Sequence, residues 1–325
     1  MQVTSKVPTS EGPNSKVMSA KALDSKDLAA NVSDDSAKDL IIPNSIVPIL
    51  SGGGTRLSAH IGILKALKDL NIEIKTLVGV SGGSIIAAMF AKGHSIDDMR
   101  ELVIATDFRQ FTAFSVWRLL REGGLSSGDH FERWIDKKLE GATFADLPIA
   151  LTILATDVNG GGPVLFGKES TPNMKVSEAV RYSMSIPLLF SFKPYREHLL
   201  VDGAILSEDA LFEDWQQDGT PTVCFRLQSA MQKRQIIKKG VLLLPQYLSM
   251  LIRTFMTAIS REYINAKYWH NTVVINTGEI SAVDFTLTPE MKNHLFELGY
   301  ETTKEYLPRK CAAFQTFKVA TTGTG

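Results

Sequence analysis

The stretch LVGVSGGSIIAAM, residues 77–89, places a serine between glycines where a strand-like run meets a helix-like run. Ser81 is flanked by Gly79 and Gly83 in the pattern G-x-S-x-G. Small neighbours allow a sharp strand-to-helix turn that presents the serine hydroxyl at the N-terminus of the helix. Backbone N–H groups and the helix dipole favour developing negative charge there. The pattern predicts a nucleophile for acyl transfer, with a turn needed only for packing as the alternative.

A second glycine-rich segment, SGGGTR at residues 51–56, follows the preceding strand-like run. Such a loop presents free N–H groups, which either hold a phosphate or stabilise the oxyanion of a tetrahedral intermediate. The phosphate pattern with Gly-Lys-Ser/Thr is missing, and G-x-G-x-x-G fails because Leu57 occupies its last position. The residues therefore favour an oxyanion hole over a phosphate site, and a glycine turn needed only for packing is the third reading.

The best candidate for a base is Asp202, which ends the apolar run in LLVDGAIL. An aspartate with a pKa near ~4 is a weak base, so this role requires desolvation of the carboxylate by apolar neighbours. A plain Asp-Gly turn is one alternative. A Ser-Asp-His triad is another, and only His270 and His294 follow Asp202 in the order of an α/β-hydrolase. Neither histidine has a recognisable setting, so the sequence favours a dyad.

The elements around these residues alternate between strand and helix. An apolar run ends at Leu50, helical spacing extends over residues 57–70, EIKTLVGV indicates a strand, and SIIAAMFAK indicates a helix that ends at Gly93. This order predicts a parallel sheet covered by helices. Further helices are predicted over 96–108, 128–139, 175–185, 241–268 and 289–306, and further strands over 147–158, 198–206, 220–227 and 271–278.

The chain organisation favours one α/β domain over residues 41–325, because no repeat or linker divides them. Residues 1–40 mix Ser, Lys, Asp and small residues without the apolar stretch of a signal peptide, which predicts a disordered tail. The longest apolar run, 241–259, contains Pro245, Gln246 and Arg253, so a membrane span is not expected. We expect a cytoplasmic or peripheral membrane protein, with export without a cleaved signal peptide as the alternative.

Composition excludes several classes of partner. The 35 basic and 35 acidic residues cancel, which argues against nucleic acid and against strongly acidic partners. Cys224 and Cys311 have no metal-ligand spacing and no disulfide framework. We therefore expect no metal and no nucleic acid.

Three motifs in order, SGGGTR, GVSGGS and VDGA, resemble the patatin-like phospholipase family over about residues 45–213. The resemblance implies an α/β fold of three layers with a central, mostly parallel sheet, which residues 214–325 complete. It implies Ser81 as nucleophile and Asp202 as base, without histidine or cofactor. It also implies an oxyanion hole made by Gly52, Gly53, Gly54, Arg56 and Gly82. Leu57 stands where the family usually has glycine, and SEDA at 207–210 stands where it has Asn-x-Pro.

The resemblance implies a lipid acyl hydrolase that cleaves fatty-acyl esters of phospholipids or lysophospholipids at a membrane surface. A thioesterase or small-ester hydrolase with the same dyad, or a catalytically inactive lipid-binding module, is the alternative. The basic segment 232–240 beside the apolar segment 241–259 could bind anionic headgroups, although a solvated basic turn is favoured. The residues favour no particular activator or oligomeric state.

Overall fold

The computed structural model describes residues 43–112, 114–205, 213–230, 247–248, 250–252, 254 and 271–322. The chain divides into a unit of Met1–Asp39 and a unit of Leu40–Gly325, and every described residue belongs to the second. Of the helix predicted over 241–268, the described residues between 247 and 254 are helical. Several predictions lie outside the described residues: the tail at 1–40, the basic segment 232–240, the SEDA segment 207–210 and His270.

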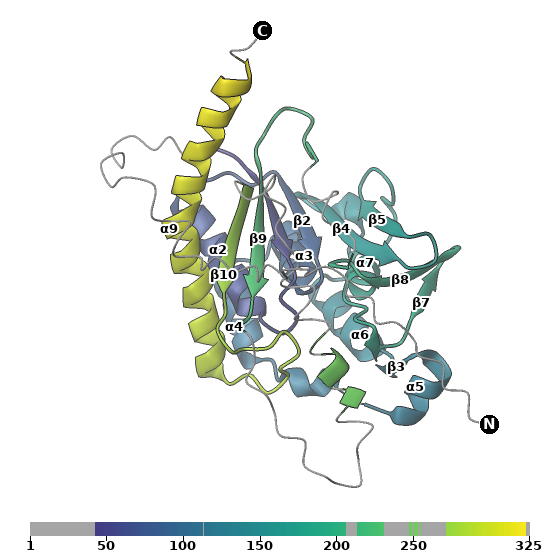
Figure 1. The fold of residues 1–325 in the computed structure, drawn as a ribbon. Coiled ribbons are helices and arrows are strands. Elements are labelled where there is room, and N and C mark those ends of the chain that lie inside the picture. The colour runs from purple at the N-terminus through teal and green to yellow at the C-terminus, as the bar shows by residue number, and fades with distance from the viewer. Residues whose placement is uncertain are drawn as a thin grey trace, which may run out of the picture. The chain divides into compact units, whose positions relative to one another are not determined.

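The described residues form an eight-stranded mixed sheet (Figure 1). Its order is β10 (Thr272–Asn276), β9 (Thr222–Gln228), β1 (Val47–Ser51), β2 (Thr76–Val80), β4 (Ala150–Asp157), β8 (His198–Asp202) and β7 (Lys193–Tyr195), and β5 (Gly162–Gly167) also pairs with β4. The first five strands are mutually parallel, whereas β5, β8 and β7 add antiparallel pairs. Strands β3 (Gly124–Ser126) and β6 (Leu188–Phe190) pair separately. The predicted mostly parallel sheet is confirmed.

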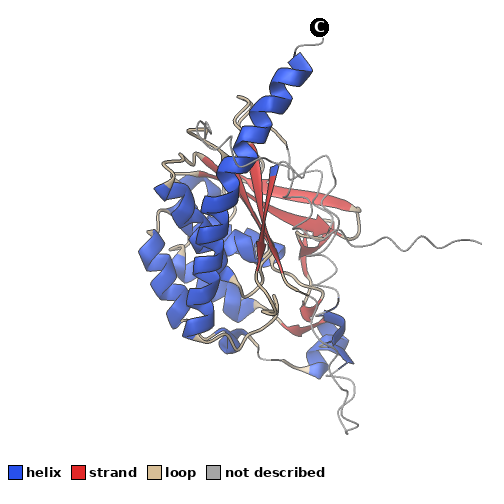
Figure 2. Ribbon diagram, turned by 60° about the vertical axis from the view of Figure 1, so that its left-hand side comes forward, coloured by secondary structure: helices blue, strands red, loops and turns tan. Residues whose placement is uncertain are grey.

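Helices flank this sheet, and Figure 2 shows most of them on one of its faces. They are α2 (Leu57–Asp69), α3 (Gly82–Lys92), α4 (Ile96–Ala105), α5 (Val116–Glu122), α6 (Asp129–Lys138), α7 (Val176–Ser183) and α9 (Pro289–Thr322), with 3₁₀ turns η2 (Phe108–Phe111) and η3 (Phe144–Asp146). Helix α9 packs along α2 and against β10. Among the described residues, no helix combines the length and the apolarity needed to cross a bilayer.

The best-predicted elements carry strong local signals. Helix α2 buries Leu57, Ile61, Leu64 and Leu67 at helical spacing and ends before Asn71, which adopts a left-handed φ of 56°. Strand β1 is buried along its whole length, and β2 is buried except at its first residue. Strands in the middle of a parallel sheet are covered on both faces, which explains their unbroken apolar runs.

The sequence analysis did not predict the short strands and helix α5, and it ended the last helix too early. Strands β3, β6 and β7 have three residues each, too few to show a periodicity. Helix α5 has seven residues between the capping side chain of Ser115 and Gly123, which ends it with a left-handed φ of 73°. Helix α9 continues through Pro308 to Thr322, although proline usually ends a helix.

Candidate active site

The predicted nucleophile lies in a tight turn between β2 and α3. Ser81 has a φ of 55° and a ψ of −133°, a backbone conformation that residues other than glycine rarely adopt. Its neighbours must be small because the turn touches the glycine loop: a Cβ added to Gly82 would lie 2.5 Å from the backbone nitrogen of Gly54. A Cβ on Gly83 would collide with the carbonyl of Leu50. The elbow and the loop therefore form one packed unit.

Strand β4 sets the distance between Ser81 and Asp202, which are 121 positions apart in the chain. On β4, Leu154 pairs with Val80 at the end of β2, and the next residue, Ala155, pairs with Asp202 at the end of β8. Strand β5 occupies the other edge of β4 over these positions, so β8 takes over the edge that β2 leaves. Ser81, the residue after Val80, and Asp202 thus come to the same level of β4.

The side chains of Ser81 and Asp202 meet in a buried hydrogen bond. Ser81 Oγ donates to Asp202 Oδ2 at 2.6 Å, and the N–H of Ala204 donates to Asp202 Oδ1 at 2.9 Å. Both catalytic candidates are fully buried. Burial raises the pKa of Asp202 to about 6, against the opposing effect of these two hydrogen bonds. The carboxylate is a stronger base than an ordinary aspartate and is still mostly ionised at neutral pH.

The last residue of α7 and the two residues after it hold both members of this pair. The N–H of Ser81 donates to Ser183 Oγ at 2.8 Å, and the N–H of Asp202 donates to the carbonyl of Ser185 at 3.0 Å. Between them, Met184 places its Sδ 4.0 Å from Ser81 Oγ. The segment 183–185 is therefore a common support for nucleophile and base, and the sequence analysis did not single it out.

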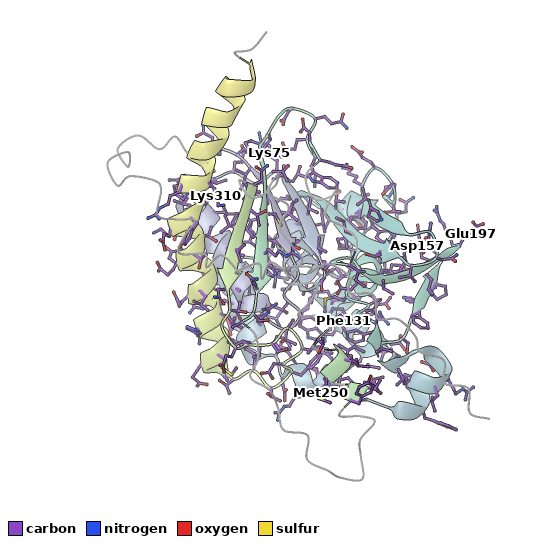
Figure 3. The ribbon with its side chains drawn as sticks, in the orientation of Figure 1. Lys75, Phe131, Asp157, Glu197, Met250 and Lys310 are labelled. Carbon is purple, nitrogen blue, oxygen red and sulfur yellow. The ribbon has the colours of Figure 1, made fainter. Side chains whose placement is uncertain are left out.

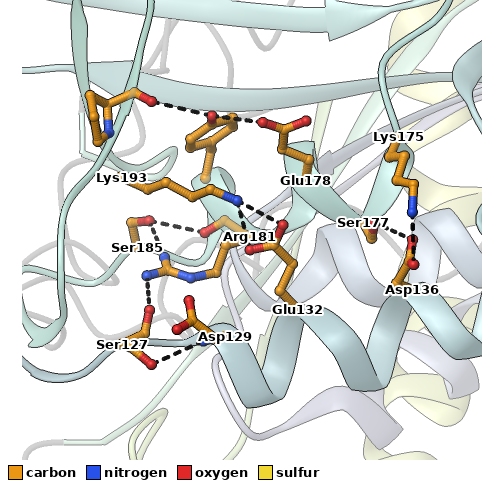
Figure 4. A network of polar contacts seen from close by, with 12 residues as sticks. Ser127, Asp129, Glu132, Asp136, Lys175, Ser177, Glu178, Arg181, Ser185 and Lys193 are labelled. Atoms are coloured by element: carbon orange, nitrogen blue, oxygen red, sulfur yellow. Dashed lines mark hydrogen bonds and ion pairs between the residues drawn. The ribbon is translucent and has the colours of Figure 1, made fainter.

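Arg181 holds the segment 183–185 in place, and Figure 4 shows its contacts with Ser185 and Ser127. Its guanidinium donates to Ser185 Oγ at 2.6 Å and to the carbonyls of Ser127 and Ser191 at 2.6 and 2.9 Å. The side chain is buried, and this desolvation lowers its pKa. A buried arginine that binds backbone carbonyls joins the chain segments that supply them. An arginine inside an amphipathic helical pattern gave no signal for this role.

The glycine loop divides into anchored and open N–H groups. Gly52, Gly53 and Gly54 have φ values of 71°, 111° and 54°. The N–H of Gly52 donates to the carbonyl of Val80 at 3.1 Å. Among the described residues, nothing accepts a hydrogen bond from the N–H of Gly53, Gly54 or Gly82. These three groups are available to an oxygen atom bound beside the elbow.

Arg56 anchors the loop. Its N–H and Nε donate to the carbonyl of Gly53 at 2.9 and 3.1 Å, and its Nη1 donates to Thr277 Oγ1 at 2.6 Å, just beyond β10. Burial lowers the pKa of Arg56 to about 10, so it remains charged at neutral pH. Gly52 uses its N–H to hold the loop, which differs from the donor role expected of it. Arg56 holds the loop through its backbone N–H, Nε and Nη1, whereas its buried Nη2 has no hydrogen-bond partner among the described residues.

An apolar pocket adjoins the pair, and it shares Gly54 and Met184 with the surroundings of Ser81. Its aromatic wall contains Phe131, labelled in Figure 3, whose ring packs against those of Phe111 and Trp134. Further apolar residues of its lining are Leu57, Ile85, Phe108, Leu189, Phe190 and Phe285. The pocket has the chemistry to hold a hydrocarbon chain next to the Ser81 hydroxyl.

Other polar clusters lie elsewhere. Asp157 Oδ2 lies 2.7 Å from His198 Nδ1, and the hydrogen bond between them lowers the pKa of the Asp157 carboxyl. Figure 3 labels Asp157, at the end of β4, and Glu197, in the turn between β7 and β8, apart from Phe131. His294 is exposed on α9, outside the site. Within the described ranges, no three side chains of the metal-binding types come together.

Comparison with known proteins identifies the family. Residues 49–212, half of the chain, match the family described as patatin-like phospholipase. The chain belongs to the patatin-like phospholipase family. The resemblance of the three sequence motifs is thereby confirmed, and membership supports a lipid hydrolase activity.

Two relatives of this family member cover most of its length, and a third covers about half. An uncharacterized protein of Acanthamoeba polyphaga mimivirus is 30% identical over 276 residues, which are 79% of this chain and 92% of that protein. YqhO of Bacillus subtilis is 27% identical over 289 residues, which are 80% and 97% of the two chains. A probable lipid hydrolase of Invertebrate iridescent virus 6 is 23% identical over 172 residues, 48% of this chain and 59% of that protein.

The fold also has a solved counterpart. The crystal structure of VipD from Legionella pneumophila matches with a TM-score of 0.59 at 17% identity, covering 82% of this chain and 67% of VipD. At this identity the likeness concerns the fold alone, and it agrees with a mostly parallel sheet flanked by helices.

Proposed function

We propose that this family member hydrolyses fatty-acyl esters of phospholipids or lysophospholipids through a Ser81–Asp202 dyad. The observation that carries the proposal is the buried 2.6 Å hydrogen bond from Ser81 Oγ to Asp202 Oδ2 in a strained elbow. The adjoining open N–H groups and apolar pocket support it. So does the relative named a probable lipid hydrolase.

In the first step, Ser81 Oγ attacks the ester carbonyl carbon while its proton passes to Asp202 Oδ2. The carbonyl oxygen gains the negative charge of the tetrahedral intermediate. The N–H groups of Gly53, Gly54 and Gly82 stabilise this oxyanion, and the last of them also begins helix α3. Gly52 and Arg56 act as anchors that keep the loop in place.

The intermediate then expels the alcohol, which takes the proton back from Asp202, and an acyl-enzyme on Ser81 remains. Water enters, loses a proton to Asp202 and attacks the acyl carbonyl. Collapse of the second intermediate releases the fatty acid, and the proton returns to Ser81. No cofactor is needed in this sequence of steps.

The apolar pocket supports a substrate with a fatty-acyl chain over one with a short acyl group. A hydrocarbon chain seated among Phe111, Phe131 and Trp134 transfers apolar surface out of water, which contributes about 0.8 kcal/mol per buried CH₂. A small ester leaves most of this wall uncovered. The pocket thus favours a fatty-acyl ester over the small-ester alternative.

The proposed partner is a membrane surface, and an exposed stripe near the pocket supports it. Trp117 and Leu120, one turn apart on α5, are 73% and 70% exposed. The half-exposed ring of Phe192 packs against Gly123 and continues the stripe. The partly exposed ring of Phe114 meets the pocket residue Phe285 edge to face. Exposed Trp, Leu and Phe of this kind insert into the headgroup region of a bilayer.

The decisive experiment compares wild type with Ser81→Ala on phospholipid vesicles and with a fluorophosphonate probe. We expect wild type to release fatty acid and to be labelled, and Ser81→Ala to do neither while it unfolds at the wild-type temperature. His294→Ala, changed at an exposed position of α9, is the matched control and should keep full activity. Equal labelling of Ser81→Ala would assign the nucleophile to another residue.

A further inference from the structure

A buried histidine beneath the glycine loop takes no part in the steps above. His60 lies in the first turns of α2 and is fully buried. Its Nε2 is 3.0 Å from the carbonyl oxygen of Gly52, and the N–H of Gly83 donates to the same oxygen at 2.9 Å. A Cβ on Gly53 would lie 2.9 Å from this nitrogen. The imidazole therefore touches both residues of the Gly52–Gly53 peptide.

The hydrogen bond determines the tautomer of His60. A carbonyl oxygen only accepts, so Nε2 must carry the proton. Burial, together with the charge of Arg56, lowers the pKa of His60 to about 4, which leaves the ring neutral near pH 7. Nδ1 is then unprotonated, and it has no hydrogen-bond partner among the described residues. The ring acts as a neutral donor of a single hydrogen bond.

This bond fixes the direction of an N–H group. In a planar trans peptide the carbonyl and the following N–H point in opposite directions. With the Gly52 carbonyl held by His60 and Gly83, the N–H of Gly53 points away from α2. Arg56 fixes the next peptide in the same way, because it holds the Gly53 carbonyl and so directs the N–H of Gly54. Glycine peptides flip easily, so open donors in this loop need such locks.

We propose that His60 is a positioning residue of the oxyanion hole, which locks the Gly52–Gly53 peptide so that the Gly53 N–H faces the substrate oxygen. The inference rests on the proposed function of Ser81 and Asp202. It assigns to a histidine a part in the reaction that involves neither general base catalysis nor contact with substrate.

A pair of variants tests the donor. Gln places an amide N–H close to the position of His Nε2, whereas Leu fills similar space without a donor. We expect His60→Leu to lower kcat by ~10²-fold, the effect of losing one oxyanion donor, with KM nearly unchanged. His60→Gln should recover most of this loss. Wild-type kcat in His60→Leu, or equal losses in two folded variants, would overturn the proposal.

A measurement on the wild-type protein covers the case in which the variants fail to fold. Proton–nitrogen correlation NMR distinguishes the two neutral tautomers of a histidine, and we expect His60 to remain neutral with its proton on Nε2 between pH 5 and 8. A proton on Nδ1 would remove the donor and refute the lock. This spectrum requires no catalysis and is therefore independent of the vesicle assay. Absence of hydrolysis by wild type in the vesicle assay would refute the proposed function, whereas a proton on Nδ1 in the spectrum would refute the role of His60.

Discussion

At the scale of single residues, the proposed dyad combines two unfavourable features. Ser81 keeps a positive φ without being glycine, and Asp202 keeps a carboxylate away from water. Raising the pKa of Asp202 from 3.8 to about 6 costs about 3 kcal/mol of folding free energy at pH values above both. Such costs persist where the surrounding structure enforces them, which here means the supports at Ser183 and Ser185. The same desolvation makes Asp202 a usable base.

Asp202→Asn should abolish hydrolysis nearly as completely as loss of Ser81, and it should also stabilise the protein. The raised pKa means that the folded state prefers the protonated carboxyl, so wild type loses stability as the pH rises from about 4 through about 6. Asparagine carries no charge, its Oδ1 can still accept from the N–H of Ala204, and its Nδ2 can donate to Ser81 Oγ, which reverses the direction of that hydrogen bond. In urea unfolding, the variant should exceed wild type by up to about 3 kcal/mol at pH 7.5 and match it near pH 4. A gap independent of pH would contradict the desolvated carboxylate.

At the scale of elements, neighbours in space come from distant parts of the chain. Strand β4 aligns β2 with β8, and the loop after β1 contacts α2 through His60. Ser183 and Ser185, at the end of α7, accept hydrogen bonds from the N–H groups of Ser81 and Asp202. The hydrogen bonds in each of these three arrangements are buried or partly buried, which makes the arrangements rigid. The glycine loop carries the N–H groups without a partner among the described residues, so a change there tests the arrangement directly.

Gly53→Ala should reduce kcat by ~10²- to 10³-fold, with substrate binding less affected, because the methyl group displaces the peptide that His60 holds. Gly93→Ala is the matched control. Gly93 ends α3 with a φ of 106°, close to the 111° of Gly53, but a Cβ there has nothing within 4 Å. Its variant should lose about 1 kcal/mol of stability and keep full activity.

Steady-state kinetics on vesicles measures this difference, and calorimetry with nucleotide tests the phosphate alternative. We expect no nucleotide binding by wild type or by Gly53→Ala. Tight, Mg-dependent binding that Gly53→Ala destroys, with unchanged ester hydrolysis, would assign the loop to phosphate instead.

At the scale of the whole molecule, the described part places an exposed apolar stripe beside an apolar pocket. The two arginines of α5 are Arg118, which pairs with Glu122 at 3.6 Å, and Arg121, and in the proposed membrane contact they would add attraction to anionic headgroups. The stripe lies on a helix that the sequence analysis did not predict. Contact with lipid through α5 would bring the substrate to the pocket that leads to Ser81.

The double variant Trp117→Ser, Leu120→Ser should bind anionic phospholipid vesicles at least ~10-fold more weakly, because each side chain contributes ~1.5–3 kcal/mol when it leaves water. Hydrolysis of a water-soluble short-chain ester should stay at the wild-type rate. Tyr306→Ser, which removes an exposed ring from α9, is the control and should bind vesicles normally. Vesicle binding unchanged by the double variant would exclude α5 as the contact surface.

The sequence by itself determined the features that depend on neighbouring residues. The elbow around Ser81 needs small residues at fixed spacing, the glycine loop needs positive φ values, and helix α2 shows its own period. The class of fold also follows from the order of strands and helices. These signals are local, so a linear pattern contains them.

The three motifs already implied that Ser81 and Asp202 act together, but only the tertiary structure decided how the two side chains meet and which other residues support them. The 2.6 Å contact of Ser81 with Asp202 depends on the register of two strands on β4, and the roles of His60, Arg56 and Arg181 depend on carbonyl groups that the fold brings to them. A histidine, an arginine or a short strand looks the same in sequence whether it holds an active site or merely fills space. Contacts between distant segments depend on the register and packing that the whole chain adopts, and no local pattern of residues specifies which segments meet.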